Sequence, residues 1–180
     1  NTLMMDGLAD GVAPIGAGLL LLRDDNQGRE PTLTSAPLDA AVLVGCSGRL
    51  RESLATVRGR GIPVVVIEGD AGEGVPRIEL DNREAQRQMA SHLRSLGQER
   101  VVALTLPRDA RRLPGWYAEE DELGIDVTRD RLAGFRDVFP DAPAYAAAAS
   151  SIDEGLAAGR VMFADPARRP TAVVAQSDLL

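Results

Sequence analysis

Short apolar runs alternate along this chain with segments whose apolar residues recur at helical spacing. The runs are four to eight residues long, and the segments between them repeat an apolar residue every three or four positions. The clearest runs are "AAVLVG" (40–45), "IPVVVIEG" (62–69), "VVALTL" (101–106) and "TAVVAQSD" (171–178). Continuous apolar strands that alternate with helices indicate parallel sheets buried on both faces. The pattern predicts an α/β fold with parallel sheets flanked by helices.

Residues 80–106 hold the sharpest helix pattern. Asp81 or Asn82 can cap the N-terminus of a helix over 83–96, and Gly97 can follow its C-terminus. Its apolar positions are Ala85, Met89, Leu93 and Leu96. The strand 101–106 follows directly.

Weaker patterns complete the prediction of secondary structure. Helical spacing marks four more segments, whose apolar positions are Met4, Leu8, Val12 and Ile15, then Leu50, Leu54 and Val57, then Leu132, Phe135 and Phe139, then Ile152, Leu156, Gly159 and Phe163. Pro14 ends or kinks the first helix, and Ser151 or Asp153 caps the last. "GLLLL" (18–22) is expected to be a strand and 75–80 a short extended piece. The alanines of "AYAAAAS" (144–150) suit a strand or a helix, and the polar stretch 23–39 suits a short helix or a loop.

Composition narrows the class of protein. The 180 residues are 44% hydrophobic but only 3% aromatic, which is typical of an aliphatic core behind helices. No apolar run approaches the roughly 18 to 20 residues of a membrane span, and no signal-peptide layout opens the chain. The single cysteine, Cys46, excludes an internal disulfide and suits a reducing, cytoplasmic compartment. The net charge of −7 argues against this chain gripping nucleic acid by itself.

Ligands of open parallel sheets collect at the carboxyl ends of the strands. Those ends are rich in Gly, Ser and Asp, at "GCSGR" (45–49), "EGDAGEG" (68–74), "PRD" (107–109) and "QSD" (176–178). No nucleophile elbow, phosphate loop or metal-ligand cluster accompanies them, and the lone His92 has no second His or paired Cys. We therefore expect a non-catalytic protein without cofactor or metal.

Four pieces of the chain, in order, resemble the lactose-repressor/galactose-repressor (LacI/GalR) family of transcription regulators. The longest is "DNREAQRQMASHLRSLGQERV" (81–101), which is similar to D-N-x-x-[GA]-x-x-x-A-x-x-H-L-x-x-L-G-x-x-[RK]-[IV] and departs from it at Met89, where the pattern has a small residue. The others are "GIPVVV" (61–66), similar to G-I-P-V-V, "RLAGF" (131–135), similar to R-x-x-G-F, and "PTAVVAQSD" (170–178), similar to P-T-A-[IV]-x-[AC]-x-[NS]-D. The resemblance covers nearly the whole chain.

The resemblance implies a periplasmic-binding-protein-like fold of two α/β lobes with an effector between them. Residues 1–98 correspond to the N-terminal lobe without its first strand, and residues 99–180 to a truncated C-terminal lobe. The strand 101–106 should begin a second sheet rather than extend the sheet of 62–69. The family's helix-turn-helix DNA-binding domain is absent from this chain, which is expected to be incomplete at both ends.

The implied function is the effector-binding and dimerisation core of a bacterial transcription regulator. Its partners would be a small-molecule effector of the sugar class and a second copy of the chain, with operator DNA bound only through the absent domain and no membrane. Candidate dimer surfaces are the first helix and the helix 51–59. The alternative is a sugar-binding protein of a transport system, and a sugar-processing enzyme is a weaker third hypothesis.

Two motifs carry the principal candidate effector-binding residues. Arg131 matches the arginine of R-x-x-G-F, whose five donors suit sugar hydroxyls or a carboxylate; the alternative is a surface arginine at a helix start. Ser177 and Asp178 match the polar pair at a strand tip, where the alternative is a helix N-cap.

Four further residues are weaker candidates for effector binding. Glu84 follows the Asp-Asn pair and can face the cleft, although an acid is favourable at any helix N-terminus. Ser47 lies at a strand tip of the first lobe. Trp116 and Tyr117 stand in the long polar segment 107–126, as a lid that stacks on a sugar ring or as a local packing anchor.

Overall fold

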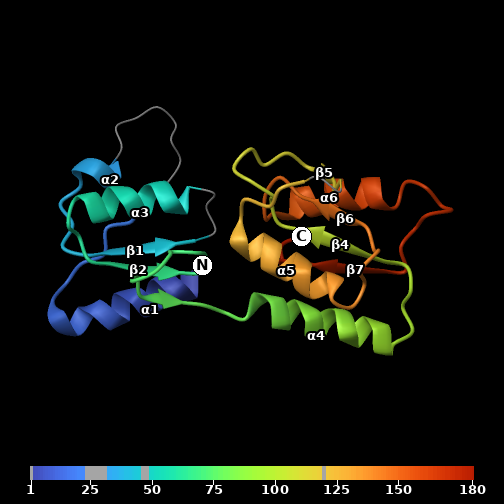
Figure 1. Cartoon of the computed structure of the whole chain (residues 1–180), viewed down its shortest axis with the longest axis horizontal. Coiled ribbons are helices and arrows are strands. Elements are labelled where there is room, and N and C mark those ends of the chain that lie inside the picture. The colour runs from blue at the N-terminus through green and yellow to red at the C-terminus, as the bar shows by residue number, and fades with distance from the viewer. Residues whose placement is uncertain (1, 23–31, 46–48, 119–120) are drawn as a thin grey trace. The chain divides into compact units, whose positions relative to one another are not determined.

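The computed structural model describes residues 2–22, 32–45, 49–118 and 121–180. They fall into two compact units, 1–37 and 38–180. Both carry helices, and the second also carries short strands (Figure 1). Each unit is described by itself.

The first unit contains the predicted first helix but not the predicted strand. Helix α1 (Thr2–Val12) is followed by a 3-10 turn, η1 (Ala13–Ile15), because Pro14 cannot donate the backbone bond that would continue an α-helix. Residues 17–22 are irregular and Leu19 to Leu21 are exposed, so the strand expected at 18–22 is wrong. No described strand of this unit offers its backbone a partner, and an extended segment without a partner forms no ladder. A single helical turn, α2 (Thr32–Ser35), follows.

The second unit opens with a parallel sheet of three strands, β1 (Ala41–Val44), β2 (Val64–Ile67) and β3 (Arg77–Ile78). Helix α3 (Leu50–Gly59) packs on one face of this sheet. Its predicted positions Leu50 and Leu54 form a core with Val66. The opposite face carries Val42, which is 44% exposed. The expectation that this sheet is buried on both faces is therefore wrong for the described residues of this unit.

A second, four-stranded sheet has the order β5 (Gly115–Trp116), β6 (Ala144–Ala146), β4 (Val101–Thr105), β7 (Ala172–Ala175). Strands β6, β4 and β7 are parallel, and β5 is an antiparallel edge strand that the sequence pattern did not predict. The prediction that 101–106 begins a new sheet is confirmed, because β4 pairs with β6 and β7 rather than with β2. The ambiguous alanine stretch forms the strand β6.

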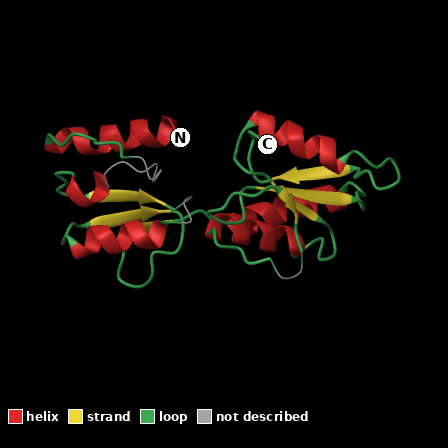
Figure 2. Ribbon diagram, turned by 90° about the horizontal axis from the view of Figure 1, so that it is seen from above, coloured by secondary structure: helices red, strands yellow, loops and turns green. Residues whose placement is uncertain are grey.

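Helices cover both faces of this sheet (Figure 2). On one face, Leu132 and Phe135 of α5 (Asp126–Arg136) pack with Ala90 of α4 (Asn82–Ser95) against alternate residues of β4 and β7. On the other face, Ala158 and Met162 of α6 (Ile152–Met162) pack against Val102 and Leu104. All five residues of β4 are buried as a result.

Helix α4 begins where its sequence predicted, with Asp81 as its N-cap. The Asp81 side chain accepts a hydrogen bond from the backbone N–H of Glu84 at 3.0 Å. The buried face is a different one from the predicted row, since it carries Asn82, Gln86 and Ala90 whereas Met89 and Leu96 are exposed. The reason is the crossing with α5, whose backbone approaches that of α4 directly. The predicted apolar row is therefore wrong at Ala85, Met89 and Leu96, which are all exposed.

The α4–α5 crossing depends on a glycine of the "RLAGF" motif. A Cβ atom placed on Gly134 would lie 2.0 Å from the carbonyl oxygen of Arg83, so only glycine allows this approach. The Arg83 guanidinium also holds Asp137 of the same region through two bonds of 2.8 and 2.7 Å. The two helices are thus joined at the first turn of α4.

Helix α6 starts at Ser151, whose hydroxyl accepts from the N–H of Glu154 at 3.3 Å. Its buried residues are Ala158 and Met162, whereas the predicted Ile152, Leu156 and Phe163 are exposed. The predicted face was therefore offset from the face that the sheet covers. Small Ala158 suits close contact with β6 better than the bulkier residues of the predicted row.

The division into lobes at residue 98 stays a prediction. The chain changes sheet between β3 and β4, and α4, which lies between them in sequence, packs against α5. Among the described residues, no helix is both long enough and apolar enough to cross a membrane.

Candidate functional site

Arg131 lies on α5 and points toward the carboxyl end of β7. Its Nε donates to Oδ1 of Asn82 at 2.8 Å, and its Nη1 donates to the carbonyl oxygen of Gln176 at 2.5 Å. The side chain is half-buried rather than free on the surface. Its place inside α5 and its partial burial argue against the alternative of a surface arginine at a helix start.

Two residues beside Arg131 are buried and polar. Asn82 is 8% exposed and Gln176 is 5% exposed. The Gln176 side chain accepts from the N–H of Leu106 at 3.1 Å and donates to the carbonyl of Thr128 at 3.2 Å. Buried polar groups are held in place when each of their atoms has a partner. Arg131 is thus anchored on a fixed framework.

Ser177 and Asp178 follow Gln176 at the end of β7. The Ser177 hydroxyl lies 2.7 Å from that of Ser150, which follows β6, and accepts from the N–H of Leu179 at 3.2 Å. The second bond is the short turn that serine makes with its own backbone. Asp178 is exposed. The topology therefore brings Arg131 and Ser177 to the same end of the sheet, because Arg131 bonds to the residue that precedes Ser177.

Glu84 faces along the surface of α4. Its carboxylate accepts from Arg87 at 2.6 and 2.7 Å and from Gln88 at 3.0 Å. The hydrogen bonds from Arg87, and then that from Gln88, lower the pKa of Glu84 to about 2. The carboxylate is engaged with its own helix, two residues after Asn82.

Trp116 and Tyr117 are held by packing rather than suspended in a loop. Trp116 meets the ring of Tyr145 edge-on, with centroids 5.3 Å apart. The Tyr117 hydroxyl lies 2.9 Å from that of Thr105, and the Arg108 guanidinium lies 5.3 Å from the ring centroid. Burial raises the pKa of Tyr117. Of the two alternatives, the contacts favour the packing anchor. Ser47 lies outside the described residues.

A polar cavity of about 240 Å³ lies between the end of β2 and the first turns of α4 and α5. Its lining carries five carboxylates and two guanidinium groups, together with Asn82 and a few other positions. These charged residues are Glu68, Asp70, Glu79, Asp126, Asp130, Arg77 and Arg129. The volume is slightly below the roughly 300–1,000 Å³ usual for small-molecule sites, so only a small ligand would be enclosed.

Hydrogen bonds connect opposite walls of this cavity. The N–H of Asp70 donates to the Asp126 carboxylate at 2.9 Å, and Asp126 is also paired with Arg129. Asp70 itself accepts from Arg51 at 2.9 Å. A backbone bond from Gly72, together with the Arg51 charge, lowers the pKa of Asp70. The carboxylates make these walls rich in hydrogen-bond acceptors.

Sequence reasoning included Glu68 and Gln176 in the polar strand ends 68–74 and 176–178 but singled out neither, and it treated Asn82 most simply as part of a helix cap. The acidic tip "EGDAGEG" contained Glu68, but its backbone turn at φ 63° is a conformation that sequence does not announce for a non-glycine residue. Gln176 precedes the motif pair Ser-Asp in the sequence. Its position at the end of a buried strand, where an amide must find partners, was the available signal.

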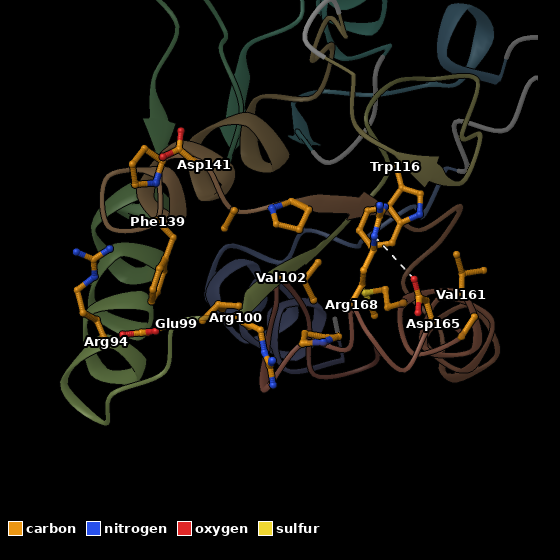
Figure 3. A pocket seen from close by; sticks show the side chains of 17 residues that line it. Arg94, Glu99, Arg100, Val102, Trp116, Phe139, Asp141, Val161, Asp165 and Arg168 are labelled. Carbon is orange, nitrogen blue, oxygen red and sulfur yellow. Dashed lines mark ion pairs between the residues drawn. The ribbon is translucent and has the colours of Figure 1, made fainter.

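A larger cavity lies elsewhere among the described residues. It measures about 800 Å³, and the first residues of β4, Val101 and Val102, are among those that line it. Figure 3 shows Val102 among the lining side chains. Arginine and acidic side chains surround it, and one pair, Arg168 and Asp165, stands 3.8 Å apart. Of the described candidate residues only Trp116 lines it. It lies at the opposite ends of the strands from Arg131 and Ser177.

Several solved structures of similar fold are LacI-family transcriptional regulators. One, from Corynebacterium glutamicum, has a TM-score of 0.72 and 25% sequence identity, over 81% of this chain and 46% of that chain. The Cra dual regulator from Pseudomonas putida, in complex with fructose 1-phosphate, has a TM-score of 0.75 and 22% identity, over 97% and 63%. A LacI-family regulator from Enterococcus faecalis with bound ribose has a TM-score of 0.76 and 18% identity, over 97% and 61%.

These likenesses confirm the resemblance seen in the motifs and the periplasmic-binding-protein-like α/β fold. The chain spans about half to three-fifths of the length of these solved structures. No protein-family model matches the sequence, and no curated protein matches it either.

Proposed function

We propose that this chain, which has the fold of LacI-family transcriptional regulators, is the effector-binding core of such a regulator. The observation that carries the proposal is the anchored Arg131 beside the polar cavity that Asn82 lines. A ligand that contacts residues from both sheets favours one arrangement of them over another. Differential affinity for two states is the general basis of such regulation.

We propose a neutral sugar as the effector rather than a phosphorylated one. Carboxylates accept hydrogen bonds from hydroxyl groups, and the cavity carries five carboxylates against two guanidinium groups. An anionic phosphate would meet repulsion from this lining. Ribose in the Enterococcus faecalis structure and fructose 1-phosphate in the Pseudomonas putida structure supply the two probes for this distinction.

The test is a thermal-shift and calorimetric screen of neutral and phosphorylated pentoses and hexoses. We expect a neutral sugar to raise the unfolding temperature, and Arg131→Ala to weaken its binding by about tenfold or more, as for the loss of a charged hydrogen bond. Arg136→Ala, an exposed arginine on the same helix, is the matched control. Equal stabilisation of wild type and Arg131→Ala would remove Arg131 from the site.

We propose smaller roles in effector binding for most of the other predicted site residues. Ser177 and Asp178 extend the site along the end of β7, and the exposed Asp178 is placed to accept sugar hydroxyls. Glu84 and Tyr117 are engaged by neighbours in the described structure, so we assign them supporting roles. Trp116 lines the other cavity, at the opposite ends of the strands, and we leave it outside the proposed site. Ser47 remains a prediction.

We further propose that the protein acts as a homodimer in the cytoplasm, binds operator DNA through a separate domain and has no catalytic activity of its own. Helix α1 is the better of the two candidate dimer surfaces. None of its described side chains is buried and Leu3 is 88% exposed, whereas α3 uses its apolar face on its own sheet. Leu3→Asp should shift a dimer toward monomer in analytical ultracentrifugation, and Arg58→Asp on α3 should not.

A further inference from the structure

Glu68 turns the chain sharply at the end of β2. It adopts φ 63°, which is uncommon for a residue other than glycine. A Cβ on the neighbouring Gly45 would lie 1.9 Å from the carbonyl oxygen of Glu68, so the end of β1 closes directly on this turn. The turn directs the Glu68 carboxylate at the start of α4, where Oε1 accepts from the N–H of Leu80 at 3.0 Å.

The second oxygen of Glu68 fixes the orientation of Asn82. Its Oε2 accepts from Nδ2 of Asn82 at 2.6 Å, while Oδ1 of the same amide accepts from Nε of Arg131. A carboxylate only accepts and a guanidinium only donates. The Asn82 amide therefore has one permitted orientation, because a flipped amide would oppose both neighbours.

Arg131 is held from its other side by the carbonyl oxygen of Gln176. With Nε and Nη1 engaged, Nη2 has no hydrogen-bond partner among the described residues. The chain of bonds runs from Glu68 at the end of the first sheet, through Asn82 and Arg131, to the end of β7 in the second. It leaves one donor group of the guanidinium for a ligand.

We infer that Glu68 and Asn82 are positioning residues that orient Arg131 for its ligand. The binding of a ligand by Arg131 rests on the proposed function. The hydrogen bonds from Glu68 through Asn82 to Arg131 do not depend on it. Glu68 accepts from Asn82, and Asn82 accepts from Arg131. A substitution that reverses donor and acceptor at Glu68 can therefore be compensated by the reverse substitution at Asn82. Both residues also line the proposed sugar cavity. Their positioning role is therefore separated from direct contact with the sugar by a readout on Arg131 that needs no ligand.

The inference is tested by exchanging the carboxylate and the amide. In Glu68→Gln, Oε1 can still accept from Leu80, but the new amide nitrogen then opposes Nδ2 of Asn82. In Asn82→Asp, two carboxylates face one another. In the double variant E68Q/N82D, the new amide at position 68 donates to one oxygen of the new carboxylate at position 82. The other oxygen of that carboxylate accepts from Arg131, so the bonds from position 68 to Arg131 are restored. The 3.3 Å bond from Nδ2 of Asn82 to the Leu80 carbonyl is lost in Asn82→Asp and in the double variant alike.

The first readout needs no ligand. The Nε–H signal of Arg131 in ¹H–¹⁵N NMR spectra, assigned by its loss in Arg131→Lys, reports the bond to residue 82. We expect Glu68→Gln to speed hydrogen exchange at the Arg131 Nε–H by about tenfold, and the double variant to return this exchange rate to near that of the wild type. We also expect each single variant to lower the unfolding temperature more than the double variant does. The control is Glu52→Gln, an exposed carboxylate on α3.

The second readout is affinity for D-ribose, the neutral sugar probe. Glu68→Gln should weaken binding and the double variant should recover it. Unchanged exchange at Arg131 in Glu68→Gln, or a double variant no better than Glu68→Gln, overturns the inference. Restored exchange in the double variant without binding of any sugar supports the positioning chain and contradicts the proposed function.

Discussion

The two sheets of residues 38–180 contain similar Val-rich parallel strands but differ in how they are covered. In the second sheet, α4 and α5 cover one face, α6 covers the other, and all of β4 is buried. In the first sheet, α3 covers one face, and the described residues of the same unit leave Val42 and Val44 exposed on the other. A run of apolar residues thus predicts a strand, but it does not predict whether helices cover one face of the sheet or both.

The strongest test of this difference between the two sheets is the same Leu→Ala substitution in each of their cores. Leu132 is 1% exposed in the second core and Leu54 is 7% exposed in the first. Leu132→Ala should lower the free energy of unfolding by about 3–5 kcal/mol, and Leu54→Ala by about 2 kcal/mol, because a half-covered sheet collapses more readily around a cavity. Urea unfolding measures both.

The single tryptophan makes the measurement specific. Trp116 belongs to the second sheet, so its fluorescence follows that sheet, whereas circular dichroism follows both. Equal losses in the two variants would mean that the two cores are equally well packed.

The next effect concerns the helix crossing at which α5 meets α4. Gly134→Ala would place a methyl group against the Arg83 carbonyl and should cost about 1–3 kcal/mol of unfolding free energy. Gly159→Ala in α6, where a Cβ would meet nothing within 4 Å, should instead stabilise the protein by about 0.4–1 kcal/mol. Thermal unfolding of the two variants gives opposite signs if the crossing is as close as described.

A smaller, pH-dependent effect comes from the Arg83–Asp137 pair at the same crossing. The hydrogen bonds from Arg83 hold the pKa of Asp137 below its usual value. A carboxyl group with a lowered folded pKa stabilises the fold above its unfolded pKa of about 3.9 and loses that contribution as the pH falls through the folded value. Asp137→Asn should therefore lower the unfolding temperature at pH 7, and the difference from wild type should shrink below about pH 4.

The matched control for this profile is Asp141→Asn, since Asp141 forms no ion pair with any described residue. A difference between wild type and Asp137→Asn that grew in acid would contradict the assigned direction of the pKa shift.

The smallest effect is expected on the open face of the first sheet. Val42→Thr replaces a methyl group of a side chain that is 44% exposed, so it should change the unfolding free energy by no more than about 0.5 kcal/mol. A loss several times larger, measured by urea unfolding, would mean that this face is covered in solution.

Much of the fold was predictable because it follows from local pattern. The strands at 41–44, 64–67 and 101–105, the Asp81 cap and the separate second sheet all follow from apolar runs, capping chemistry and the motif resemblance. The strand expected at 18–22 failed because pairing is not local. The faces of α4 and α6 were offset because close backbone contact, as at Gly134, selects small residues that a count of large apolar side chains overlooks.

The candidate site was predictable only in part. Arg131 could be found from its motif, but its partners Asn82 and Gln176 are separated from it by 49 and 45 residues. Glu68 depends on a backbone conformation that no residue pattern indicates. Residues that bond across such distances become neighbours only through the packing of α4 on α5.

The Gly134 crossing also has a consequence for how the molecule opens. Backbone amides that lie in one cooperative unit exchange with solvent together. Because α4 lies against α5, its amides should become accessible in the same opening events as those of α5 and β4, and more slowly than those of α3. The transition between fast- and slow-exchanging backbone would then fall at the Asp81–Asn82 pair, where α4 begins, rather than at Gly97, where it ends.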